Sequence, residues 1–113
     1  MSNMRNKVQL IGRLGQDPEV VNFDGGKKKA NLNLATNSVY YDKAGDKVEE
    51  TQWHKVVAWG KNAETIEKFL RKGQEVAISG KLTSRSWEDE KGSKRYITEI
   101  MLQEFLMLGR KES

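Results

Sequence analysis

The stretch TQWHKVVAWG, Thr51–Gly60, indicates a β-strand whose two faces differ in chemistry. Side chains alternate between the two sides of a strand, so His54, Val56 and Ala58 point in one direction and form the predicted core face. The opposite face carries two of the three tryptophans of the chain, together with a lysine. It consists of Trp53, Lys55, Val57 and Trp59. The strand therefore predicts a core on one side and a large amphipathic surface, open to solvent or to a partner, on the other.

The composition describes one small domain and excludes several classes of protein. A chain of 113 residues buries roughly two thirds of its surface on folding, which is enough for a hydrophobic core without disulfides or a structural metal. The sequence has no cysteine and one histidine, so we expect no disulfide, no metal site and no other cofactor. No segment approaches the roughly 18–20 apolar residues that span a bilayer, and we expect a cytoplasmic protein without a membrane partner. The net charge of +4 favours polyanions mildly.

Two further strands are predicted before the opening stretch. In the first, Val8, Leu10 and Leu14 share one side, and Gly12 lies on that side where a strand could bend. After a glycine-rich turn at residues 24–26, a second alternating strand runs to Tyr40. Its inward residues are Ala30, Leu32 and Leu34, and the polar segment at residues 42–50 is predicted to be the hairpin loop that follows.

The spacing of apolar residues changes once, after the third strand. From Asn62 onward, it becomes helical and places Ala63, Ile66, Phe69 and Leu70 on one side. Asn62 is the predicted N-terminal cap, and Gly73 stands where the helix should end. This is the only helix that the pattern supports.

Two more strands complete a β-β-β-α-β-β order. In the fourth, Val76, Ile78 and Leu82 share the inward side and Gly80 offers a bend; the fifth runs from Arg95 to about Leu108. The fold class is therefore all-β with one short helix, and the order is that of the five-stranded OB-fold barrel. Such barrels often bind single-stranded nucleic acid or oligosaccharides.

The fourth strand repeats the aromatic and basic pattern of the third. Its outward side carries Lys81, Thr83, Arg85 and Trp87. Aromatic rings stack on any base, and lysine and arginine follow phosphates without reading sequence. Two strands thus independently predict a surface for single-stranded nucleic acid.

Each of these features also has a simpler interpretation. A tryptophan in a barrel strand is often part of the core or of an interface. The run Lys27–Lys29 is more typical of a solvated turn than of a binding site. The acidic residues 88–90 are better explained as a charged turn than as a metal or acid/base cluster. His54 lies among apolar residues and has no second histidine or cysteine to act with, which favours a packed or interface role.

Five stretches of the chain resemble the bacterial single-stranded DNA-binding proteins. They are NKVQLIGRLGQDPEV (Asn6–Val20), LATNSVYYDK, TQWHKVVAWGKNAE, FLRKGQEVAISGKL and SRSWEDEKGSKRYITEI. The resemblance implies an OB-fold that assembles as a homotetramer, a dimer of dimers, and wraps single-stranded DNA during replication, recombination and repair, in association with the nucleoid. It also implies base stacking at Tyr40, Trp53, Trp59 and Trp87, and phosphate contacts from Lys55, Lys61, Lys72 and Arg85.

The sequence departs from the family pattern at three places. Tyr40 stands where the family often has tryptophan, and Trp59 where it often has phenylalanine, so stacking is retained in kind. We assign residues 1–108 to the DNA-binding OB-fold and residues 109–113 to a short C-terminal end without the family's acidic tail. Because that tail recruits replication and repair proteins in the family, we expect weak recruitment of such partners.

Subunit contacts are predicted on the first strand. Ile11 is an apolar residue on the outward side, which suggests that Lys7, Gln9 and Ile11 pair with the same strand of a neighbouring subunit. The resemblance adds His54 to this interface. Two alternatives to a DNA-binding protein remain: an OB-fold nuclease or hydrolase, and a protein-interaction module or replication accessory of the primosomal type.

Overall fold

The computed structural model describes residues 3–109, so that residues 110–113 of the predicted C-terminal end lie outside the described part. A 3₁₀ turn, six strands and one helix follow one another along the chain. They are η1 (Asn3–Arg5), β1 (Val8–Leu14), β2 (Glu19–Asn22), β3 (Lys28–Tyr41), β4 (Lys47–Trp59), α1 (Lys61–Phe69), β5 (Glu75–Glu88) and β6 (Lys94–Leu108). No helix within residues 3–109 has the length and apolar character needed to cross a membrane.

Five of the strands close into a barrel. The sheet order is β1-β5-β6-β4-β3-β2. β1 also pairs with β3 through Arg13 and Leu14, which closes β1, β5, β6, β4 and β3 into a ring and leaves β2 outside it. Only β4 and β6 are parallel, at Val56↔Ile100 and Val57↔Met101. This arrangement confirms the predicted five-stranded OB-fold. The sequence did not predict β2, a four-residue strand that pairs with the start of β3 and is too short to show a clear alternation.

The residues predicted to face inward form the core of the barrel. In β3 and β4 the inward residues Leu32, Leu34, Val56 and Ala58 are all buried. The helix closes one end of this core with Ala63, Ile66 and Leu70. Val76 and Ile78 of β5 and Ile100 and Leu102 of β6 complete it.

The predicted cap of α1 is wrong. The chain leaves β4 through Gly60, which has a φ of 62° and is the N-cap residue, while Asn62 lies inside the first turn. A positive φ with an extended ψ suits glycine because it has no Cβ. The Asn62 side chain instead donates a hydrogen bond from Nδ2 to the carbonyl oxygen of Gln103, 3.3 Å away. Asn62 therefore ties the helix to β6 rather than capping it.

Two apolar residues predicted to face the core are exposed. Phe69, the last residue of α1, is 53% exposed because Leu70 takes the buried position beside it. Leu82 is 49% exposed because β5 and β6 leave the barrel beyond Gly80 and have no opposite wall there. At Gly80 the strands approach so closely that an added Cβ would lie 2.2 Å from the carbonyl oxygen of Met101. The pairing also shifts here, since Ser79 pairs with Glu104 and Gly80 with Leu102.

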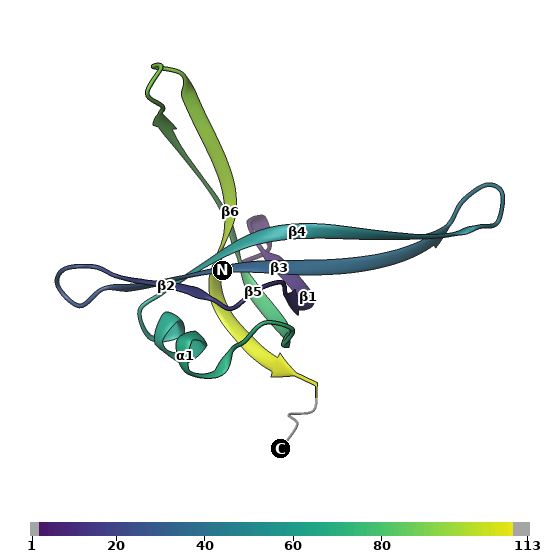
Figure 1. Ribbon diagram of the computed structural model, residues 1–113, viewed down its shortest axis with the longest axis horizontal. Helices are drawn as coiled ribbons and strands as arrows, with labels where there is room; N and C mark the ends of the chain where they lie inside the picture. The colour runs from purple at the N-terminus through teal and green to yellow at the C-terminus, as the bar shows by residue number, and fades with distance from the viewer. Residues whose placement is uncertain (1–2, 110–113) are drawn as a thin grey trace.

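Two long hairpins extend from the barrel in different directions (Figure 1). We call them the β3–β4 arm, residues 36–52, and the β5–β6 arm, residues 81–98. Both end in the same kind of turn, in which an aspartate accepts hydrogen bonds from backbone N–H groups two and four residues ahead. In the β5–β6 turn, the hydrogen bond from the backbone of Ser93 lowers the pKa of Asp89, and the hydrogen bond from Arg95 acts in the same direction.

Candidate nucleic-acid interface

The outward face of β4 presents the predicted aromatic and basic residues in two groups. Trp53 is 62% exposed, Lys55 is exposed, and Trp59 is 41% exposed. Val57, predicted to share this surface, is buried. Its strand is flanked there on both sides, by Asn31 of β3 and Met101 of β6. The face is therefore divided into a Trp53–Lys55 part and a Trp59 part.

Gly15, the residue directly after β1, fixes the position of the Trp53 ring. A Cβ added at Gly15 would lie 2.4 Å and 2.6 Å from two carbons of the indole. The backbone of Gly15 is itself fixed, because its N–H donates to the carbonyl oxygen of Asn33. The indole thus lies against bare backbone, which limits how far it can move while one side stays open to solvent.

Replacing Gly15 with alanine tests this placement without removing an aromatic ring. The added methyl group should displace the exposed indole and leave the core untouched, so we expect weaker binding to single-stranded DNA with an unchanged melting temperature. Titration of wild type and G15A with an oligonucleotide, alongside thermal melting, measures both. If G15A binds as tightly as wild type, the contact with Gly15 does not position the indole for binding.

The β5–β6 arm carries a stacked pair of Arg85 and Trp87. The Arg85 guanidinium carbon lies 5.6 Å from the centre of the Trp87 ring, a cation–π arrangement, and Trp87 is 45% exposed. The Arg85 Nε–H donates to Glu99 Oε1, 3.1 Å away. Within residues 3–109 no other N–H group of this guanidinium has a hydrogen-bond partner, so the rest of it is available for an anion.

Glu99 is an acidic residue of this surface that the sequence did not single out. Its side chain is almost fully buried, and Oε2 has no hydrogen-bond partner among residues 3–109. The register places Glu99 opposite Thr83, with Arg85 two residues further along the same face. A cross-strand comparison of β5 with β6 could have found it, since a lone carboxylate beside an arginine predicts an ion pair.

Trp59 has neighbours that sequence reasoning also missed. Phe23 stacks on it, with ring centroids 5.9 Å apart and an angle of 28° between the planes. Lys29 is the direct strand partner of Trp59, and its Nζ lies 5.5 Å from the centre of a Trp59 ring. The missed signal was β2 itself, because Phe23 directly follows that strand.

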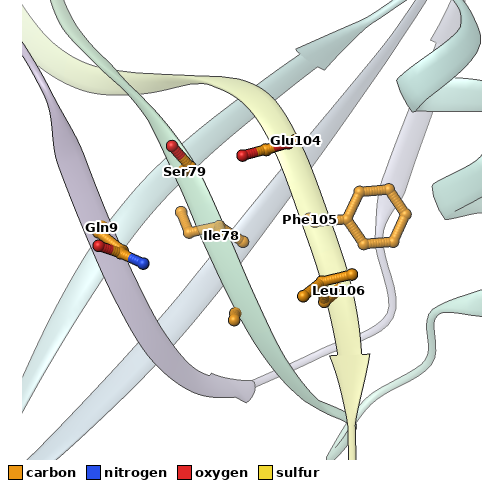
Figure 2. Close-up of a pocket in the computed structure, with 7 residues that line it drawn as sticks. Gln9, Ile78, Ser79, Glu104, Phe105 and Leu106 are labelled. Atoms are coloured by element: carbon orange, nitrogen blue, oxygen red, sulfur yellow. The ribbon is translucent and has the colours of Figure 1, made fainter. Parts of the chain in front are cut away.

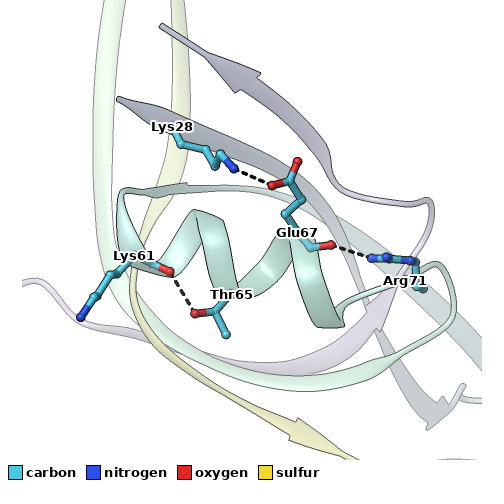
Figure 3. Close-up of polar contacts among 5 residues, drawn as sticks. All are labelled: Lys28, Lys61, Thr65, Glu67 and Arg71. Carbon is cyan, nitrogen blue, oxygen red and sulfur yellow. Dashed lines mark hydrogen bonds and ion pairs between the residues drawn. The ribbon is translucent and has the colours of Figure 1, made fainter. Parts of the chain in front are cut away.

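The other predicted DNA contacts are exposed but lie apart from these groups. Tyr40 is near the tip of the β3–β4 arm, where strand alternation puts it on the face opposite to Trp53. Lys61 opens α1, and its side chain points away from the helix (Figure 3). Lys72 follows α1 in a turn, where its backbone N–H donates to Asp17 Oδ1, 2.8 Å away.

Of the residues predicted at the subunit interface on or beside β1, Ile11 lies on an apolar row. Gln9 is exposed and Ile11 is 58% exposed, while Lys7 just precedes the strand. Across the sheet, Ile11 is level with Ala77 of β5 and Leu106 of β6, which is 69% exposed. Beside this row, a shallow pocket of about 150 Å³ includes Gln9, Ser79 and Glu104 in its lining (Figure 2).

His54 lies on the inward side of β4, as predicted, and is half-buried. Its Nε2 lies 2.9 Å from Thr36 Oγ1, a hydrogen bond within the β3–β4 pair. Within residues 3–109, no group of three or more histidine, aspartate or glutamate side chains is placed to hold a metal ion.

A closed five-stranded barrel with one capping helix and aromatic, basic strands on its outside defines an OB-fold of the kind that binds nucleic acids. Comparison with known proteins narrows this class. Residues 5–108 match the Single-strand binding protein family, and the chain belongs to that family.

Two curated relatives extend the match over the whole chain. The chain is 46% identical to "Single-stranded DNA-binding protein 1" of Chlorobaculum tepidum, covering 100% of this chain and 70% of that protein. It is 45% identical to the protein of the same description from Xylella fastidiosa, covering 95% of this chain and 79% of the relative.

Solved structures share the fold. A Plasmodium falciparum SSB complex with ssDNA superposes with a TM-score of 0.83 at 36% identity, over 92% of this chain and 95% of that chain. A deletion mutant of the single-stranded DNA binding protein from Thermus aquaticus gives a TM-score of 0.81 at 32% identity, over 92% of this chain and 50% of that one.

Proposed function

We propose that the protein binds single-stranded DNA without sequence preference and protects it during replication, recombination and repair. The observation that carries this proposal is the repeated pairing of an exposed tryptophan with a cation on outward strand faces: Trp53 with Lys55, Trp59 with Lys29, and Trp87 with Arg85. Exposed indoles stack on any base, and the cations neutralise phosphates. The relatives' descriptions support the same ligand.

The proposed contacts divide into stacking and phosphate binding. Bases stack on the three tryptophans and, at the end of the β3–β4 arm, on Tyr40. Phosphates meet Lys55, Lys61, Lys72 and Arg85, all of which are exposed. Because Tyr40 and Trp53 lie on opposite faces of the β3–β4 hairpin, a DNA strand that touches both has to wrap around it. We propose that this occurs in the cytoplasm, on nucleoid DNA, as the match to bacterial relatives supports.

Titration of the protein with oligo-dT, followed by tryptophan fluorescence, tests the function. We expect tight binding with quenching that weakens as salt is raised. Absence of quenching at low salt would instead support the protein-interaction alternative, including a primosomal type of accessory.

A cleavage assay separates a binding protein from an enzyme. We propose that the protein is not an enzyme, so labelled single-stranded DNA incubated with it and Mg²⁺ or Ca²⁺ should remain intact. Cleavage above background that follows the protein through purification would favour the OB-fold nuclease.

Lys55 and Arg85 should respond differently to neutral substitution. Each phosphate contact contributes about 0.7 to the log–log dependence of affinity on salt for single strands, so Lys55→Gln should lower the slope by about that amount. Arg85→Gln should lower the slope and also the melting temperature, because it leaves the Glu99 carboxylate buried without its partner. Salt titrations and thermal melting measure both; a salt slope unchanged in K55Q would place Lys55 outside the phosphate path.

We further propose a homotetramer, built as a dimer of dimers. Among the described residues, β1 pairs with β3 only at Arg13 and Leu14, so Val8–Gly12 keeps an open edge on that side. The open edge supports pairing with the same strand of a second subunit through Lys7, Gln9 and Ile11, with His54 nearby in the interface. Sedimentation at micromolar concentration tests this, and a monomer would overturn it.

A further inference from the structure

We propose that the β2–β3 hairpin forms an additional nucleotide-binding site, in which Phe23 takes a base and Lys27 and Lys29 take phosphates of the same single strand. This inference rests on the proposed function and extends the DNA path from the Trp59–Lys29 pair to Phe23 and Lys27. It gives a role to a lysine run whose sequence alone is more typical of a solvated turn than of a binding site.

The hairpin continues the outward face of β4. Lys29 is paired with Trp59 on one side and with Val21 of β2 on the other, so all three residues lie in one row across the sheet. Phe23 follows β2, and its backbone N–H donates to the carbonyl oxygen of Lys27, 2.7 Å away. The hairpin therefore lies on the same face as Trp53 and Lys55, although buried Val57 separates the two parts of that face.

The aromatic pair at this end is placed for stacking rather than for the core. Phe23 is 45% exposed and stacks on Trp59, which is 41% exposed. A base that stacks on Phe23 would extend an existing stack of two rings. Base–aromatic stacking tolerates every base, which fits the lack of sequence preference.

The three lysines of the run have different surroundings. Lys28 Nζ lies 2.6 Å from Glu67 Oε1 of α1, so its charge is already paired (Figure 3). Lys27 is exposed, and within the described chain neither it nor Lys29 takes part in an ion pair. Two of the three cations are therefore available for phosphates, and the third provides an internal control.

The hairpin also leaves room for a strand to approach. An open pocket of about 500 Å³ is lined by Gly26, Lys27, Lys28, Trp59 and Gly60. Nothing lies within 4 Å of a Cβ added at Gly26 or Gly60, so their backbone borders open space. A phosphate bound between Lys27 and Lys29 would lie next to the Phe23–Trp59 pair. In a DNA strand each phosphate is close to a base, so one nucleotide could contact both.

The test compares a lysine double variant with a single control on the same hairpin. K27Q/K29Q should lower the salt slope by about 1.4, twice the contribution of one phosphate. K28Q should lower the slope by less than the roughly 0.7 of one free phosphate contact, because the Lys28 charge is already paired with Glu67. Both are measured as oligo-dT affinity against salt concentration, using an oligonucleotide long enough to saturate the wild-type protein. Equal slopes in K27Q/K29Q and wild type would overturn the phosphate part of the proposal.

The base contact is tested at Phe23. F23A should weaken affinity for the long oligonucleotide about tenfold, and F23Y should restore it, while F23L, which fills space without an aromatic face, should not. If F23L binds like wild type, Phe23 only packs against Trp59 and the stacking role is wrong. The wild-type protein in the same experiment separates this site from the proposed function. If the wild type does not bind the oligonucleotide, the proposed function is wrong. If the wild type binds and the hairpin variants bind equally well, only the additional site is wrong.

Discussion

Replacing Leu34 with alanine is expected to lower the free energy of unfolding by about 2–5 kcal/mol, the usual cost of truncating a fully buried leucine. Leu34 is completely buried, and it lies in β3 next to the point where β1 closes the barrel. The loss combines the transfer free energy of the removed atoms with the cavity that remains. Because a domain of this size has a stability of about 5–15 kcal/mol, such a loss should be large in a urea titration.

Leu82→Ala is the matched control. The sequence places both leucines on inward strand positions, but Leu82 is 49% exposed on the β5–β6 arm. We expect L82A to change stability far less than L34A, with both measured at the same protein concentration so that subunit association does not contribute. Equal losses would mean that Leu82 is covered in solution, for example by a second subunit.

Replacing Trp53 with alanine is expected to weaken binding to single-stranded DNA by about 1–3 kcal/mol, or roughly 5- to 150-fold. Trp53 is the most exposed of the three tryptophans, at 62%, and so contributes little to the core. Its ring lies against Gly15, which restricts the orientation of the indole before a base stacks on it. Fluorescence titration with oligo-dT measures the affinity, and circular dichroism checks the fold.

Two further variants show whether the ring itself is responsible. W53F keeps an aromatic face and should recover most of the lost affinity. Tyr96→Ala removes an aromatic ring that is 70% exposed on the β5–β6 arm, on the face opposite to Arg85, and should cost much less. A Y96A variant that binds as weakly as W53A would mean that aromatic exposure alone, and not the predicted face, governs binding.

The alternation of side chains predicted the barrel well because the core strands are covered on one side only. Leu32, Leu34, Val56 and Ala58 are buried as expected. The errors arise where a residue's environment depends on distant parts of the chain. Val57 is buried because β6 joins β4 beside it, although it lies on the outward side. Leu82 has the correct alternation but extends past the end of the barrel.

Tyr40, Lys61 and Lys72 of the candidate site were predicted from the family resemblance, and the other residues from the pattern of single strands. Contacts between strands were missed. Trp53, Lys55, Arg85 and Trp87 are exposed, as strand alternation predicts, but their assignment as DNA contacts stays a prediction. Residues contributed by other strands, such as Phe23 against Trp59 and Glu99 against Arg85, required the tertiary pairing. The contact between the Trp53 ring and Gly15 likewise cannot be seen in the sequence, because the two residues are far apart along the chain.

The pairing of β1 has a consequence for how the chain is made. β1 is synthesised before its main partner, the Glu75–Gly80 part of β5, which follows about 65 residues later. At a synthesis rate of roughly 5–20 residues per second, the first strand waits for about 3–13 seconds without that partner. During this interval the apolar residues of β1, including Ile11, can associate with other nascent chains that are translated from the same mRNA. Chaperones that bind nascent chains should therefore have a larger effect on the yield of folded protein than the stability of the folded state has.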